Sequence, residues 1–278
     1  MQLGIFAKTF VATDVDGCLA AVAAAGIPAV QFNFSVAGLP TIPTEPVPDG
    51  VLDDIRAAAD RHGIELAAIS GTFNTAHPDR DVTQDGIDRF VWLADAAAAL
   101  AIPVITLSSG SRDPQDMWRW HPDNATSAAW EDSRTSLRAL ATIAESTGVK
   151  IAFEPEHSNV VATADQALLM LDEVGSPALG LVYDAANLLD PDGYDPTIAE
   201  QAIVADIAKL APHILLAHAK ELTAGRAPVP PGAGYLPWPL IVHELAAGGF
   251  DGTLVTHGLA EAEVPQAVAT LRSALADS

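Results

Sequence analysis

Four residues that can bind a metal ion or transfer a proton stand at the ends of short β-rich runs. They are Glu154 in "KIAFEP", Asp184 in "LGLVYD", His218 in "ILLAHA" and His257 in "TLVTH". Two carboxylates and two imidazoles suit Mn²⁺, Co²⁺, Fe²⁺ or Zn²⁺ better than Ca²⁺. Any one of them could be a structural polar residue, and His257 could equally be a catalytic acid or base or the cap of a strand. Their recurrence on four consecutive runs predicts one divalent metal centre.

Two further ionisable residues follow these runs at a spacing of two. Glu156 comes two positions after Glu154, and Lys220 two positions after His218. Side chains two apart on a strand point to the same face, so both are expected to face the metal centre. Glu156 is interpreted either as a catalytic base or as a residue that orients Lys220 or a metal ligand. Lys220 could bind a substrate oxygen or phosphate, stabilise an enolate, form an ion pair or, less favoured, form a Schiff base.

Other polar and aromatic residues near the predicted strand ends are candidates for substrate contacts. They are Lys8, His77, Arg112, Trp118 and His121, of which the loop histidines and the arginine could also be purely structural. Two connections, 111–126 and 223–238, are unusually long, and long loops in compact domains are often functional. Their aromatic side chains could either stack on a sugar ring or pack one loop against another.

The elements that must position these residues alternate between strand and helix. Strands are predicted at residues 3–7, 29–34, 65–70, 104–109, 150–155, 179–184, 214–219 and 253–257. Helices are predicted at 14–26, 51–62, 85–101, 128–147, 164–174, 198–210, 239–247 and 263–276. This alternation is typical of a parallel α/β sheet, and eight units in 278 residues predict a single (β/α)8 TIM barrel domain over residues 1–278. A doubly wound open sheet is the alternative, but no GxGxxG follows the first run.

Composition limits the classes of partner. Acidic residues outnumber basic ones 36 to 14, which gives a formal net charge of −22. Nucleic-acid phosphates and anionic membrane surfaces would repel such a chain, so a small-molecule partner is expected. The single Cys18 cannot form an internal disulfide, and "MQLGIF" lacks the regions of a signal peptide. With no apolar run long enough to cross a bilayer, the protein is expected to be cytoplasmic.

Several stretches resemble the xylose isomerase-like TIM barrels, the sugar phosphate isomerase/epimerase superfamily. They are "LGIFAKTF", "SGTFNTAHPD", "MWRWHPDN", "IAFEPE", "LVYDAANLL", "LLAHAKEL" and "GFDGTLVTHGL", which together span essentially the whole chain. The resemblance implies one divalent metal ion (Mn, Co, Mg, Fe or Zn), a carbohydrate substrate and often a homo-oligomer. The family's usual Glu, Asp, His and Glu ligands fall on Glu154, Asp184, His218 and His257.

The chain departs from the family pattern at two positions. His257 replaces the usual fourth glutamate, and Asn187 replaces a substrate-binding histidine three residues after Asp184. In the epimerases of the family, two glutamates act as paired acid and base, and His257 cannot be the second carboxylate. A neutral imidazole can still bind metal. We therefore expect His257 as a ligand, Glu154 or Glu156 as the base and Asn187 as a substrate contact.

The resemblance and the residues together predict a metal-dependent isomerase or epimerase of a sugar or sugar derivative that works through an enediolate. A lyase or dehydratase acting on a keto-sugar or inositol derivative is the alternative, because the same intermediate could expel a leaving group. The apurinic endonuclease branch of the fold uses three zinc ions and a basic groove, which this chain does not offer. A non-enzymatic sugar-binding role would predict neither tightly bound metal nor turnover.

Overall fold

Eight parallel strands close into a barrel in the computed structural model, which describes residues 1–189, 195–223 and 227–276. The barrel strands are β1 (Gln2–Phe6), β2 (Ala29–Phe32), β3 (Glu65–Ser70), β4 (Val104–Ser108), β5 (Lys150–Glu154), β6 (Leu179–Asp184), β7 (Ile214–Ala219) and β10 (Thr253–Thr256). They pair in the order β1-β10-β7-β6-β5-β4-β3-β2, and β1 also pairs with β2 to close the ring. This confirms the predicted single (β/α)8 barrel.

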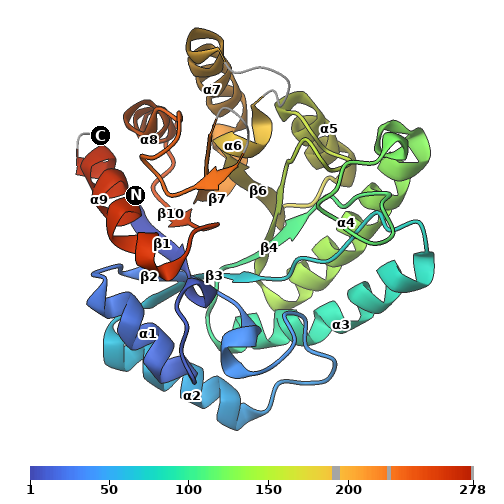
Figure 1. Ribbon diagram of the computed structural model, residues 1–278. Coiled ribbons are helices and arrows are strands. Elements are labelled where there is room, and N and C mark those ends of the chain that lie inside the picture. The colour runs from blue at the N-terminus through green and yellow to red at the C-terminus, as the bar shows by residue number, and fades with distance from the viewer. Residues whose placement is uncertain (190–194, 224–226, 277–278) are drawn as a thin grey trace.

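Helices surround the strands, as Figure 1 shows. They are α1 (Val15–Ala24), α2 (Asp49–His62), α3 (Arg80–Ala99), α4 (Ser127–Thr147), α5 (Ala164–Val174), α6 (Ala185–Leu188), α7 (Pro196–Leu210), α8 (Trp238–Ala247) and α9 (Val264–Ala276). Their ends carry ordinary capping signals: the Thr163 side chain accepts the Gln166 N–H at the start of α5, and Gly175 ends it in the left-handed conformation. In the part of the chain that is described, no helix combines the length and the apolar character needed to cross a membrane.

The barrel interior is built in layers that follow from strand alternation. One layer is apolar and consists of Ala68, Val104, Ala152, Val182, Leu216 and Val255. Two positions further along the same strands come Ser70, Thr106, Glu154, Asp184, His218 and His257. Because residues two apart point to the same side of a strand, the second set stacks on the first towards the C-terminal mouth. An apolar floor thus lies beneath a polar layer.

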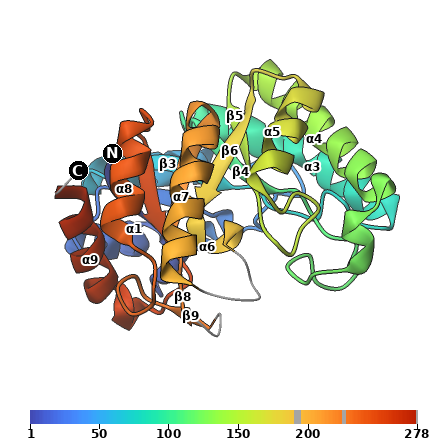
Figure 2. The same cartoon turned by 90° about the horizontal axis from the view of Figure 1, so that it is seen from above.

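The connection from β7 to α8 differs from the long loop predicted over 223–238. Glu221–Leu222 forms β8, which pairs antiparallel with β9 (Pro228–Val229), and residues 224–226 between them lie outside the described part of the chain. Figure 2 shows this short hairpin on the same side of the barrel as α6. Helix α8 begins at Trp238, whose side chain is buried and does not lie on an exposed loop.

Candidate metal centre

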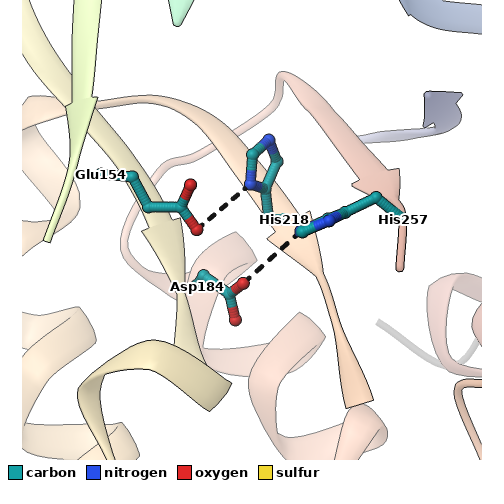
Figure 3. Close-up of side chains that lie close together, drawn as sticks. All are labelled: Glu154, Asp184, His218 and His257. Atoms are coloured by element: carbon teal, nitrogen blue, oxygen red, sulfur yellow. Dashed lines mark ion pairs between the residues drawn. The ribbon is translucent and has the colours of Figure 1, made fainter. Parts of the chain in front are cut away.

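Four side chains from neighbouring strands converge at the C-terminal mouth of the barrel (Figure 3). Glu154 ends β5, Asp184 ends β6, His218 lies in β7, and His257 directly follows β10. Each contributes one atom able to bind a metal, and these atoms all lie within 4.8 Å of one another. Glu154 Oε1 is 3.3 Å from His218 Nδ1, and Asp184 Oδ2 is 3.6 Å from His257 Nε2. The structure therefore brings together the four residues predicted as ligands.

Three atoms of this cluster are buried without a hydrogen-bond partner among the described residues. They are Asp184 Oδ2, His218 Nδ1 and His257 Nε2. Leaving a polar atom buried and unsatisfied costs about 1–3 kcal/mol, so such atoms call for a physical explanation. A carboxylate oxygen and two imidazole nitrogens are ligands of first-row divalent ions. The donor set and its unsatisfied atoms therefore fit a bound divalent cation.

The electrostatics of the cluster favour the protonation states that bind metal. Burial opposes ionisation of Glu154, but the nearby His218, Lys220 and His257 outweigh it and lower the Glu154 pKa to about 2. Burial lowers the pKa of His257, and the neighbouring His218 lowers it further, against the opposing effect of Asp184. Metal ligands must be ionised carboxylates and neutral imidazoles. Glu154 and His257 are held in those forms.

Aromatic rings hold the two histidines in place. Phe6, the last residue of β1, stacks on His257 with a centroid separation of 4.7 Å and an interplanar angle of 17°. The two imidazole rings meet edge to face at 4.5 Å. Offset stacking and edge-to-face contacts are favourable arrangements of aromatic rings. Phe6 is a supporting residue that the sequence analysis missed.

Gln31 is a second supporting residue that the sequence analysis missed. It is buried in β2, and its Oε1 lies 2.9 Å from His218 Nε2. Its Nε2 donates hydrogen bonds of 3.0 Å to Ser70 Oγ and 2.9 Å to Thr106 Oγ1. The signal that could have found it is its polarity within the otherwise apolar run "AVQF".

The family model described as "Xylose isomerase-like TIM barrel" matches residues 19–274. The chain belongs to this family. Among solved structures it is similar to the apo 3-keto-D-glucoside 4-epimerase YcjR from E. coli, with a TM-score of 0.78 and 15% identity over 98% of this chain and 99% of that chain. It is also similar to D-psicose 3-epimerase with D-tagatose from Clostridium cellulolyticum H10, with a TM-score of 0.76 and 19% identity over 99% of each chain. A third similar structure is the IolI protein with a bound zinc atom, with a TM-score of 0.72 and 19% identity over 100% of this chain and 97% of that chain.

A cavity of about 470 Å³ opens over the cluster of this xylose isomerase-like barrel. Glu156 and Lys220 both line it, together with three residues predicted to contact substrate: Lys8, Trp118 and Asn187. Trp118 comes from the loop between β4 and α4 and is 48% exposed. The neighbouring turn is held by the Met117 carbonyl, which accepts a 3.1 Å hydrogen bond from Asn159. The indole gives the cavity an apolar wall.

Asn187 connects Glu154 of the cluster to Lys220 beside it. Its Nδ2 donates a 2.6 Å hydrogen bond to Glu154 Oε1, and its Oδ1 accepts one from Lys220 Nζ. Lys220 Nζ also lies 3.9 Å from Asp184 Oδ2. Glu156 lies beyond the end of β5, so strand alternation does not determine the direction of its side chain. The side chain nevertheless lines the cavity.

The other predicted substrate contacts are not among the residues that line the cavity. Arg112 pairs with Asp132 at 2.6 Å and donates to the Ala76 carbonyl. His77 lies 3.3 Å from the Pro114 carbonyl, and His121 accepts a backbone N–H from the 3₁₀ turn that follows it. These side chains hold the loops that follow β3 and β4, and their placement lends no support to the predicted substrate contacts.

Proposed function

We propose that the protein is a divalent-metal-dependent isomerase or epimerase of a sugar or sugar derivative that acts through an enediolate intermediate. The observation that carries the proposal is the convergence of two carboxylates and two imidazoles beneath an open cavity at the barrel mouth. The similar structures named 3-keto-D-glucoside 4-epimerase and D-psicose 3-epimerase support a carbohydrate as the substrate.

Glu154, Asp184, His218 and His257 would hold the ion. When bound, a divalent ion supplies Lewis acidity that polarises neighbouring carbonyl and hydroxyl oxygens of a substrate and so acidifies the adjacent C–H bond. The two imidazoles favour Zn²⁺, Mn²⁺, Co²⁺ or Fe²⁺ over Mg²⁺, which prefers oxygen ligands. The zinc atom bound in the structure of the IolI protein is in line with this preference.

Glu156 is assigned as the base that removes the α-proton. Glu154 is one of the four clustered residues and accepts a hydrogen bond from Asn187, and the neighbouring His218, Lys220 and His257 lower its pKa against the effect of burial, which suits a ligand better than a proton acceptor. Glu156 lines the cavity and is not among the four clustered residues. Its carboxylate would take the proton from the carbon beside the carbonyl.

Lys220 is assigned as the group that stabilises the enediolate. Its ammonium is held by Asn187 and lies near Asp184, so it is positioned at the edge of the cluster and lines the cavity. A cation there lowers the energy of negative charge that develops on the substrate oxygens. Return of the proton to the neighbouring carbon isomerises the sugar, and return to the opposite face of the same carbon epimerises it.

Solvent deuterium exchange tests this reaction class. The protein, loaded with Mn²⁺ or Zn²⁺, is incubated in D₂O with a panel of ketoses and 3-keto-glycosides and followed by NMR, with metal-free protein as the control. The expected result is deuterium at the carbon beside the carbonyl together with an isomeric product. Loss of water or of the aglycone would instead establish the lyase or dehydratase reaction. Bound ligand without any exchange would contradict an enzymatic role.

A further inference from the structure

Two hydroxyl groups and one imidazole surround the carboxamide of Gln31. Its amide nitrogen donates to Ser70 at the end of β3 and to Thr106 in β4. An amide nitrogen carries only two hydrogens, so these contacts use both of them. In the structure the carboxamide oxygen faces His218 and lies 2.9 Å from its Nε2.

In the metal-bound protein, the contact of Nε2 with Gln31 and the place of Nδ1 beside Glu154 together indicate which nitrogen of His218 carries hydrogen. A carboxamide oxygen can only accept a hydrogen bond, so Nε2 must be the donor. A neutral imidazole has one N–H and one lone pair, which leaves the lone pair on Nδ1. That atom is buried without a hydrogen-bond partner among the described residues and lies 3.3 Å from Glu154 Oε1. A lone pair and a carboxylate oxygen this close are compatible when both face a cation.

We propose that Gln31 is a positioning residue that selects the tautomer of His218, so that His218 binds the metal through Nδ1. Gln31 acts through the imidazole rather than on the reacting atoms. The inference concerns metal binding alone, so it does not depend on which sugar reaction the site catalyses.

The position of Gln31 in the barrel strengthens its hydrogen bond with His218. It reaches from β2 to β7, two strands that are separated in the ring by β1 and β10. Both Gln31 and His218 are almost fully buried, with exposures of 2% and 3%. The apolar interior layer lies beneath them, and hydrogen bonds in such a low-dielectric setting are stronger than in water.

NMR of the unsubstituted protein tests the tautomer directly. Protein with nitrogen-15 histidine is loaded with cadmium-113 and studied at a pH two units above the ordinary imidazole pKa of about 6.5. A His218→Asn variant identifies the signals. We expect hydrogen on Nε2, none on Nδ1, and a scalar coupling between the metal and Nδ1. Hydrogen on Nδ1, which would mean the reverse orientation of the carboxamide, or coupling to Nε2 would overturn the proposal.

Variants of Gln31 separate orientation of the ring from packing. Gln31→Leu should weaken Zn²⁺ affinity by roughly 10–100-fold, the usual effect of losing a partner behind a ligand. Gln31→Glu keeps an oxygen that accepts from Nε2 and should retain affinity within a few-fold. Thr75→Val is the matched control, because it removes a buried hydroxyl whose hydrogen bond goes to the Ser108 carbonyl, outside the histidine network.

Chelator competition with Zn²⁺ gives the affinities, and circular dichroism checks that each variant is folded. Unchanged affinity in Gln31→Leu, or equal loss in Gln31→Leu and Gln31→Glu, would overturn the proposal. If Gln31→Leu does not fold, the NMR measurement on the unsubstituted protein still tests which nitrogen of His218 carries hydrogen. A negative result for Gln31 would not contradict the proposed sugar reaction, because that reaction is tested separately by deuterium exchange.

Discussion

His257 combines the properties of a metal ligand without the charge of a carboxylate. Its side chain is 16% exposed, and its ring is stacked on Phe6. Gly258 follows at once with φ of 73°, a left-handed conformation that favours glycine, and turns the chain away from the strand. His257 is thus the last residue before the turn, and its Nε2 faces Asp184.

Removing this imidazole should weaken metal binding sharply. His257→Ala is expected to lower Zn²⁺ affinity by more than about 100-fold, because even the outer partners of ligands contribute about 10–100-fold. His257→Glu should keep most of the affinity, since it replaces the imidazole with a carboxylate that can also bind the metal. Metal analysis of the purified variants and chelator competition provide the measurement. Unchanged metal content in His257→Ala would show that the four residues do not form one site.

The two glutamates should separate into a ligand and a base. Glu156→Gln is expected to lower kcat by about 10²–10⁴-fold, the usual contribution of a general base, with the metal retained. Glu154→Gln should lose metal as well as activity. Parallel measurement of metal content and of deuterium exchange distinguishes the two. If Glu156→Gln keeps full deuterium-exchange activity, Glu156 is not the base, and Glu154 is the remaining candidate.

At the scale of elements, one buried carboxylate anchors the segment between β7 and α8. Glu221 in β8 is 1% exposed and accepts hydrogen bonds from the backbone of Tyr235 and Leu236 and from the indole of Trp238. Hydrogen bonds to a charged group contribute about 1.5–3 kcal/mol each. Glu221 therefore ties the short hairpin, which directly follows Lys220, to the start of α8.

Glu221→Ala should destabilise the fold by at least about 3 kcal/mol, because it removes the shared acceptor of several buried N–H groups. For a chain of this size we expect an unfolding temperature lowered by roughly 6–12 °C, measured calorimetrically. Glu200→Ala, at an exposed position of α7, is the control and should leave the unfolding temperature unchanged. Similar unfolding temperatures for both variants would rule out the anchoring role.

A second carboxylate organises the loop over 111–126, which carries Trp118. Asp113 accepts hydrogen bonds from the Arg119 guanidinium at 2.5 and 2.8 Å and from the backbone of Gln115 and Asp116. Arg119 first, and then the backbone N–H of Gln115, hold the pKa of Asp113 well below its ordinary value. The loop is therefore fixed around an ionised carboxylate.

This depressed pKa sets the direction of the pH dependence. The stabilisation is fully present above the unfolded aspartate pKa of about 3.9 and is lost as the pH falls through the lower folded pKa. Asp113→Asn should loosen the loop already at neutral pH, seen as faster hydrogen exchange over 111–126 and altered tryptophan fluorescence. Asp123→Asn, at an exposed position of the same loop, is the control. Equal protection in both variants would contradict this role of Asp113.

At the scale of the whole molecule, metal binding should be linked to stability. An ion that binds only the folded chain stabilises it by about 2.7 kcal/mol at a hundredfold excess over Kd. Zn²⁺ or Mn²⁺ should therefore raise the unfolding temperature, and a chelator should reverse the shift. In the His257→Ala variant, the metal should raise the unfolding temperature only slightly. The same rise in that variant would indicate that metal binds elsewhere on this acidic chain.

The barrel and the convergence of the four candidate ligands were predictable because both depend on local periodicity. Runs of β-rich residues separated by helical segments specify parallel strands, and strand C-terminal ends meet at one mouth of the barrel. Glu154, Asp184 and His218 all stand at such ends, so their convergence followed from strand geometry. The short hairpin of β8 and β9 was missed, since its two-residue strands are too brief to show a period.

The sequence by itself thus determined a (β/α)8 barrel and the four side chains at its mouth. Only the tertiary structure decided which loop residues reach the cavity: Trp118 lines it, whereas Arg112 pairs with Asp132 on α4. The same holds for Gln31, whose contact with His218 joins residues 187 positions apart. Alternation sets the face of a strand on which a side chain lies, but its partner depends on which distant segments pack against that face.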